Sequence, residues 1–111
     1  MTNATLNETM QQIEKEINQN PEPIASMDTV YQFEIDGEAY QLQLKDGQAK
    51  ILEHKVDPNC TLVMSYDNFN KFLAGKLNGM AAFMTGKLKI QGDITKALKL
   101  ETIVKQYELD I

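Results

Sequence analysis

Apolar residues near the start of the chain recur at helical spacing. They are separated by three or four residues with polar residues between them, which is typical of one face of an amphipathic helix. These positions are Leu6, Met10, Ile13 and Ile17. We predict a helix over residues 1–19, which ends before Asn20-Pro21 because proline disfavours helical dihedrals in the preceding residue. A polar linker over residues 20–28 follows.

From residue 30 the hydrophobic period changes to two, which indicates half-buried strands. Turn signals interrupt the alternation at Asp36-Gly37 and Asp46-Gly47. We predict a four-strand antiparallel meander over residues 30–65, with its third strand at 48–54. One face of this sheet is apolar and buried. Water or a polar partner covers the other face, which carries Gln32, Glu34, Gln41, Gln43 and Lys45.

Helical spacing returns after residue 65, and the predicted helices cover residues 67–84. The first of them carries Phe69, Phe72, Leu73 and Leu77. A fifth strand is predicted at 87–91 and a closing helix at 93–109, capped by Asp93. With 111 residues, the chain is the size of one domain, so residues 1–111 form a single α+β unit.

Charge and composition exclude several classes of function. No apolar run approaches the roughly 18 residues that cross a bilayer, and the N-terminus lacks the pattern of an export signal, so we expect a cytoplasmic protein. The net charge is −5 and all 11 basic residues are lysines. Nucleic-acid binding is therefore disfavoured, because no guanidinium is present to contact bases or phosphates bidentately.

Catalytic candidates are few. His54 is the single histidine, at the end of a predicted strand, and Cys60 is the single cysteine. One cysteine builds neither a disulfide nor a thiolate metal site, and we interpret it as a small reduced core residue. The sequence predicts no enzyme, no cofactor and no metal site.

Six methionines are the remaining unusual feature of the composition. Met80 and Met84 flank Phe83, and Met64 lies in the preceding strand. These flexible side chains fit two interpretations, a core filled by methionine or a cavity for an apolar ligand.

Several blocks in the second half of the chain resemble the sterol carrier protein family of the non-specific lipid-transfer type. The blocks are Gly75-Lys76-Leu77, Phe83, Gly86 to Asp93 and Ala97 to Leu100. Earlier blocks at Gln32 to Gly37, Asp57 to Leu62 and Asp67 to Phe69 are also similar. Each block is weak alone, but their order and spacing over nearly the whole chain are specific.

The resemblance implies a five-stranded, largely antiparallel sheet covered on one face by helices, with an apolar tunnel between the layers. It implies non-catalytic binding and intracellular transfer of a fatty acid, a fatty acyl-CoA or a similar lipid. The chain ends in Leu109-Asp110-Ile111 and not in a peroxisomal signal, which favours a bacterial-style member. By position, the ligand wall comprises Phe33, Phe72, Leu77, Met80, Phe83, Met84, Leu100, Ile103, Val104 and Tyr107.

Further partners follow from charge and from the polar face of the sheet. Residues 71–105 carry seven lysines against two acids, so this region either attracts anionic membranes or CoA phosphates, or is an ordinary solvated surface. The polar face of the sheet permits a homodimer. The alternative function is an accessory module that presents an isoprenoid or quinone intermediate to partner enzymes.

Overall fold

The computed structural model describes residues 6–107 and 109 and has helices and strands in the predicted order. In chain order they are α1 (Leu6–Gln19), the short 3-10 helix η1 (Glu22–Ile24), β1 (Asp28–Ile35), β2 (Glu38–Lys45), β3 (Gln48–Ile51), β4 (Cys60–Met64), α2 (Tyr66–Leu73), α3 (Gly79–Met84), β5 (Lys89–Gly92) and α4 (Ile94–Tyr107). The predictions for residues 1–5 and 108 lie outside the described residues.

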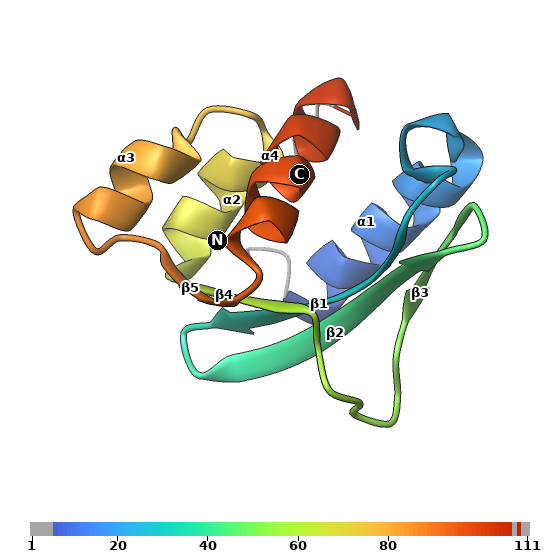
Figure 1. The fold of residues 1–111 in the computed structure, drawn as a ribbon, viewed down its shortest axis with the longest axis horizontal. Coiled ribbons are helices and arrows are strands. Elements are labelled where there is room, and N and C mark those ends of the chain that lie inside the picture. The colour runs from blue at the N-terminus through green and yellow to red at the C-terminus, as the bar shows by residue number, and fades with distance from the viewer. Residues whose placement is uncertain (1–5, 108, 110–111) are drawn as a thin grey trace.

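All four helices labelled α lie on one face of a five-stranded sheet (Figure 1). The strand order is β3-β2-β1-β4-β5, and three of the four pairings are antiparallel. The side chains of β1 alternate between buried and less buried, as the period of two predicts. The prediction of an α+β fold with a largely antiparallel sheet covered on one face is therefore confirmed.

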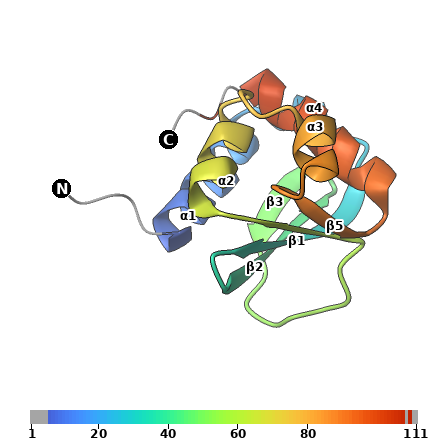
Figure 2. The ribbon, with the colours of Figure 1, turned by 90° about the vertical axis from the view of Figure 1, so that its left-hand side faces the viewer.

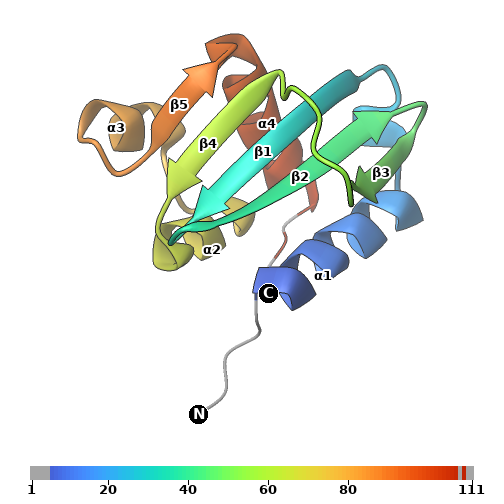
Figure 3. The ribbon, with the colours of Figure 1, turned by 90° about the horizontal axis from the view of Figure 1, so that it is seen from below.

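The fourth strand corrects the predicted meander. Strands β1 to β3 form antiparallel hairpins, but β4 pairs in parallel with β1, with Phe33 opposite Leu62. After Ile51 the chain leaves the sheet edge and crosses the face opposite the helices before it enters β4 (Figure 3). The predicted third strand is thus too long, and His54 is an exposed loop residue. Alternation specifies a strand but not its neighbour, which explains the error.

Gln41 holds this crossing loop against the sheet. Its side chain is on the predicted polar face but is only 3% exposed. The Gln41 amide nitrogen donates to the Val56 carbonyl at 2.7 Å, and its amide oxygen accepts from the Val56 N–H at 3.0 Å. The amide nitrogen also donates to Gln32 at 2.9 Å. The protein's own loop thus covers part of the face that was expected to meet water or a partner.

Helix α1 closes the outer edge of β3 with side-chain hydrogen bonds. The Asn18 amide exchanges two hydrogen bonds with the backbone of Ala49, at 2.8 and 2.9 Å, and Glu14 accepts from the Ile51 N–H at 2.8 Å. Edge strands carry unpaired backbone groups that otherwise invite association with another chain. The apolar face of α1 is buried, as predicted.

Helix α2 ends earlier than its apolar pattern suggests. Gly75 has a φ of +75°, a conformation that glycine adopts without a Cβ penalty. Its N–H bonds the Phe72 carbonyl, and the Lys76 N–H bonds the Lys71 carbonyl at 2.8 Å. This is a Schellman motif. Leu77, predicted on the helix, therefore lies in the connection between α2 and α3.

Candidate functional site

The ten residues of the predicted ligand wall occupy three settings. Five are at most 3% exposed between the sheet and the helices, namely Phe33, Phe72, Leu100, Ile103 and Val104. Two are partly buried against the core, Leu77 and Tyr107. The remaining three, Met80, Phe83 and Met84, are exposed on α3. The structure brings the first five into one apolar layer and leaves α3 at its margin.

Aromatic side chains of β1 lie at the centre of this layer. The ring centroids of Tyr31 and Phe33 are 6.5 Å apart, and those of Phe33 and Phe69 on α2 are 5.3 Å apart. The Tyr31 hydroxyl donates to the Lys96 carbonyl of α4 at 2.7 Å. Burial raises the pKa of Tyr31, so the hydroxyl stays a neutral donor at physiological pH. This hydrogen bond thus joins β1 to α4 across a largely apolar interior.

The far end of α4 contacts the segment that follows α1. The Tyr107 hydroxyl donates to the Asn20 carbonyl at 2.5 Å. Partial burial raises the pKa of Tyr107, which keeps this donor protonated at neutral pH. At its other end α4 begins at the predicted Asp93 cap, which accepts from the Thr95 N–H at 3.0 Å.

Helix α3 is tied to α4 at its first residue. Asn78 caps α3 by accepting from the Ala81 N–H at 3.0 Å. The Gly79 N–H donates to the Glu101 carboxylate of α4 at 3.1 Å, and this carboxylate lies 3.4 Å from the Lys105 ammonium. A Cβ at position 79 would lie 2.5 Å from Glu101 Oε1, so glycine permits this close approach. The N-terminal end of α3 therefore rests directly on α4.

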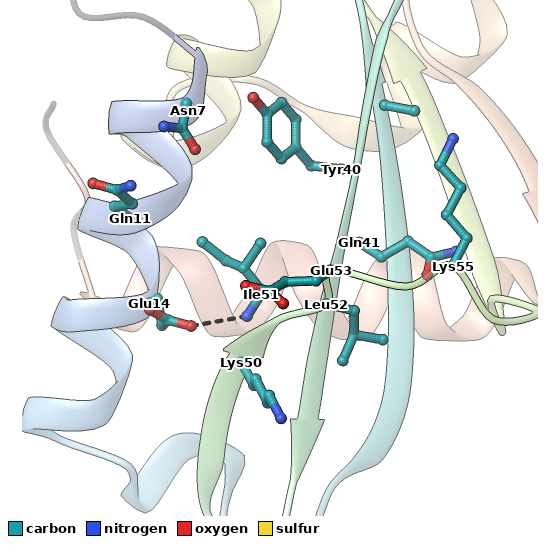
Figure 4. A pocket seen from close by; sticks show the side chains of 11 residues that line it. Asn7, Gln11, Glu14, Tyr40, Gln41, Lys50, Ile51, Leu52, Glu53 and Lys55 are labelled. Carbon is teal, nitrogen blue, oxygen red and sulfur yellow. Dashed lines mark hydrogen bonds between the residues drawn. The ribbon is translucent and has the colours of Figure 1, made fainter.

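A groove of about 580 Å³ opens on the other side of the molecule, between α1, β2 and the end of β3 (Figure 4). Its lining mixes apolar, amide and charged side chains: Asn7, Gln11, Glu14, Ala39, Tyr40, Gln41, Lys50, Ile51, Leu52, Glu53 and Lys55. The predicted wall contains none of them. Tyr40 and Ile51 pack against the core, so the groove reaches the helix–sheet layer from the side. It forms only because α1 docks beside a strand that ends at Ile51, and local sequence patterns carry no signal for this.

Cys60 and His54 lack the surroundings of catalytic groups. Cys60 is fully buried in β4, which confirms its predicted place in the core. Burial, with a smaller effect of the Asp93 charge, raises the pKa of its thiol to about 11. It is therefore protonated at neutral pH and is a poor nucleophile. His54 lies exposed in the β3–β4 loop.

The described part of the chain lacks two features that would point to other functional classes. Within residues 6–107 and 109, no three histidine, cysteine, aspartate or glutamate side chains are grouped so that they could hold a metal ion. Over the same residues, no helix has the length and apolar character needed to cross a membrane.

Comparison with known proteins identifies the family. The model of the SCP-2 sterol transfer family matches residues 7–105. The chain belongs to this family. Hydroxysteroid dehydrogenase-like protein 2 of Xenopus laevis is 40% identical over 108 residues, which cover 93% of this chain and 25% of the relative. This chain therefore spans about a quarter of the length of that relative.

Solved structures of SCP-2 domains share the fold. The sterol carrier protein domain 2 of Helicoverpa armigera covers 100% of this chain and 98% of its own, with a TM-score of 0.75 and 24% identity. The UbiJ-SCP2 ubiquinone synthesis protein covers 89% and 95%, with a TM-score of 0.72 and 21% identity. The palmitated SCP2L2 of Aedes aegypti covers 88% and 93%, with a TM-score of 0.63 and 20% identity. At these identities the similarity concerns the fold.

Proposed function

We propose that this chain binds a single-chain lipid, a fatty acid or fatty acyl-CoA, between its helices and its sheet, and transfers it without chemistry of its own. Membership of the SCP-2 sterol transfer family over residues 7–105 carries this proposal. The palmitated form of the Aedes aegypti neighbour supports a fatty acyl chain as the cargo. The buried, protonated Cys60 thiol supports a carrier over an enzyme.

The helix–sheet layer supplies the apolar surroundings that such a ligand needs. Phe33, Phe72 and Leu100 present three elements of the fold to one interior. We propose that the acyl chain enters an apolar tunnel among these side chains and that α3 lies at its margin. Met80 and Phe83 on α3 would then contact the ligand when it passes between solvent and interior.

The expected affinity suits a carrier that must release its cargo. Burying about 14 methylenes at roughly 0.8 kcal/mol each gives about 11 kcal/mol. Association costs of about 4 kcal/mol or more leave about 7 kcal/mol or less. This corresponds to a Kd of about 10 μM or weaker for the chain alone.

Native mass spectrometry and displacement of a fluorescent fatty acid test the binding. We expect the purified protein to carry a bound lipid and to release the fluorescent probe when oleate is added. A protein without bound lipid, from which oleate displaces no probe, would refute the proposal.

Single-tryptophan variants locate the ligand, because the chain contains no tryptophan. Phe72→Trp places a fluorophore in the layer, and Tyr40→Trp places one in the groove beside α1. A brominated fatty acid should quench the tryptophan at position 72 and leave that at position 40 bright. The opposite result would move the ligand into the groove. Circular dichroism checks that both variants keep the fold.

One observation is consistent with the accessory-module alternative. The UbiJ-SCP2 ubiquinone synthesis protein shares the fold, but at 21% identity this similarity does not favour a quinone or isoprenoid over a fatty acid. Extraction of the purified protein separates the two functions. A polyprenyl compound in the extract, with no fatty acid, would favour the alternative.

A further inference from the structure

Strand β2 is longer than the strand that pairs with its outer side. It spans Glu38–Lys45, whereas β3 pairs only with residues 42–45 and ends at Ile51, opposite Leu42. After Ile51 the chain turns away and crosses the face opposite the helices (Figures 2 and 3). Within the part of the chain that the structure describes, no strand pairs with residues 38–40 on this side. We call residues 38–40 the open edge of β2.

The backbone of Ala39 faces outward at the open edge of β2. The Leu52 N–H donates to the Gln41 carbonyl at 3.0 Å, so the backbone groups of Gln41 point away from β1. Alternate residues of an antiparallel strand direct their N–H and C=O groups to the same side. The N–H and C=O of Ala39 therefore also point away from β1, at a place where β3 has already ended. Backbone groups in this position can pair with another extended chain.

Helix α1 binds a strand backbone with polar side chains that lie along one side of the helix. These residues are spaced by three and four positions, and they are Asn7, Gln11, Glu14 and Asn18. Asn18 and Glu14 hydrogen-bond the backbone of β3, at Ala49 and Ile51. Asn7 and Gln11 continue the same side of α1 past the end of β3, and both line the groove (Figures 3 and 4). The helix thus presents two further amide side chains where a longer β3 would run.

The groove of about 580 Å³ lies between these amides and the open edge of β2. Ala39 and Tyr40 line it from the sheet, and Asn7 lines it from α1. Tyr40 and Ile51 are partly buried against the core, so they supply the apolar part of the lining. A chain paired with β2 would place the side chain opposite Tyr40 against this apolar part, because residues opposite each other on neighbouring strands share a face.

We propose that an extended peptide segment of a partner protein binds in this groove and adds to the sheet as a continuation of β3. Its backbone would bond Ala39 on one side and the amides of Asn7 and Gln11 on the other, just as the backbone of β3 bonds both β2 and α1. Main-chain hydrogen bonds hold peptides at open sheet edges in this way. The groove lining carries two lysines and two glutamates. Its charges balance, so an apolar side chain opposite Tyr40 and not a charge selects the segment.

This inference goes beyond the proposed function, because it concerns a different part of the molecule. The groove lies beside α1, whereas α3 lies at the β5 edge on the opposite side of the sheet (Figure 3). A partner segment in the groove therefore leaves α3 uncovered, and the partner and a lipid can be bound at the same time.

Selection of random hexapeptides, displayed on phage, with the full chain as the target tests the proposal. We expect enriched sequences that lack a central proline and carry apolar residues at alternate positions, as a half-buried strand does. A synthetic peptide of an enriched sequence should shift the NMR resonances of the Ala39 and Gln41 amides in the isotope-labelled chain. It should also slow hydrogen exchange of the Ala39 N–H, because this group becomes a donor to the peptide.

Substitution of Ala39 separates backbone pairing from side-chain contact. Ala39→Pro removes the outward N–H and should abolish peptide binding. The sheet should tolerate it, because proline is accepted in a strand where the N–H takes no part in the ladder. Ala39→Val keeps the N–H and has a high strand propensity, so it should bind the peptide as the unmodified protein does. Circular dichroism checks that both variants keep the fold.

Substitutions on α1 test the other side of the groove. Asn7→Ala/Gln11→Ala should weaken peptide binding about tenfold, because each side-chain hydrogen bond contributes about two- to tenfold in affinity. Both side chains are exposed, so we expect the variant to unfold at the same denaturant concentration as the unmodified protein. The matched control Gln19→Ala/Gln91→Ala removes two exposed amides that do not line the groove and should leave the binding unchanged.

Three results would overturn the peptide proposal. They are no enrichment of any hexapeptide, peptide binding that survives the substitutions at Ala39 and on α1, and an equal loss of binding in Gln19→Ala/Gln91→Ala. A concentration-dependent dimer that Ala39→Pro abolishes, without peptide enrichment, would assign the open edge of β2 to a second copy of the chain instead. If Ala39→Pro does not fold, Asn7→Ala/Gln11→Ala and the NMR shifts decide.

Displacement of the fluorescent fatty acid is measured separately in the same variants. We expect it to be unchanged in Asn7→Ala/Gln11→Ala, because the groove and the helix–sheet layer bind different ligands. Its loss in that variant would assign the groove to the lipid and overturn the peptide proposal. Failure of peptide binding is thus distinguishable from failure of lipid binding.

Discussion

The hydrogen bond between Gly79 and Glu101 should control how readily α3 opens. Glu101→Ala removes the acceptor, and Gly79→Ala removes the contact in another way, because a Cβ at position 79 would lie 2.5 Å from Glu101 Oε1. The carboxylate must then move away. Two unrelated substitutions thus break the same interaction.

The expected magnitude follows from the type of bond and its exposure. A hydrogen bond to a charged group contributes about 1.5–3 kcal/mol. The Glu101 side chain keeps 16% of its surface exposed to water. Water can therefore partly replace the lost bond, which places its contribution near the lower limit of this range. A loss of about 1.4 kcal/mol corresponds to a tenfold larger open population of α3. Global stability should change less, because α3 buries only Gly79 and Ala82.

Native-state hydrogen exchange measures this opening. The Ala82 and Thr85 amides, which bond the Asn78 and Ala81 carbonyls, should exchange about tenfold faster in both variants, while amides in the middle of α4 should keep their rates. Glu101→Gln retains an acceptor oxygen, and its exchange should stay near that of the unmodified protein. If α3 gates the ligand, dissociation of a fluorescent fatty acid should accelerate by a similar factor.

Unchanged exchange of α3 in both Glu101→Ala and Gly79→Ala would refute the reasoning. So would an equal acceleration in Lys105→Ala, because that substitution removes the ion pair at 3.4 Å and leaves the Gly79 bond in place. Faster exchange throughout the chain would indicate global destabilisation and not the opening of one helix.

Three further predictions concern the scaffold. Gln41→Ala should destabilise the protein by about 1–3 kcal/mol in urea unfolding, because it removes the bonds to the Val56 backbone, whereas Gln43→Ala on the same sheet face should cost less. Burial raises the pKa of the Cys60 thiol from 9.0 to about 11, so the thiol ionises at a lower pH in the unfolded chain than in the folded one. The free energy of unfolding should therefore fall as the pH rises from 9 to 11. The same fall with pH in Cys60→Ala would contradict this. Ser65→Ala should lower the melting temperature through loss of about 1 kcal/mol, because Ser65 Oγ accepts from the Asn68 N–H at the start of α2, and an unchanged melting temperature would show that this cap is unimportant.

Local periodicity determined the elements of this protein and the face that each one buries. The alternation in β1 predicted that Phe33 is buried and that Glu34 is less so, and the burial pattern agrees. Spacing by three and four residues predicted the apolar stripe of α1, which is buried. These features depend on neighbours along the chain, because the period of a helix or strand fixes which side chains share a face.

Tertiary structure decided how those elements meet. The parallel pairing of β4 with β1 depends on a loop crossing the sheet, and burial of Gln41 depends on that same loop. The groove beside α1 depends on where the helix docks. The exposure of Met84 depends on how α3 is attached to Glu101. Glu101 belongs to α4 and lies more than ten positions further along the chain than Met84. The family resemblance, applied by position, predicted a wall of ten apolar residues. It does not distinguish a side chain buried in the layer from one at the surface, because burial is set by contacts between segments distant in sequence.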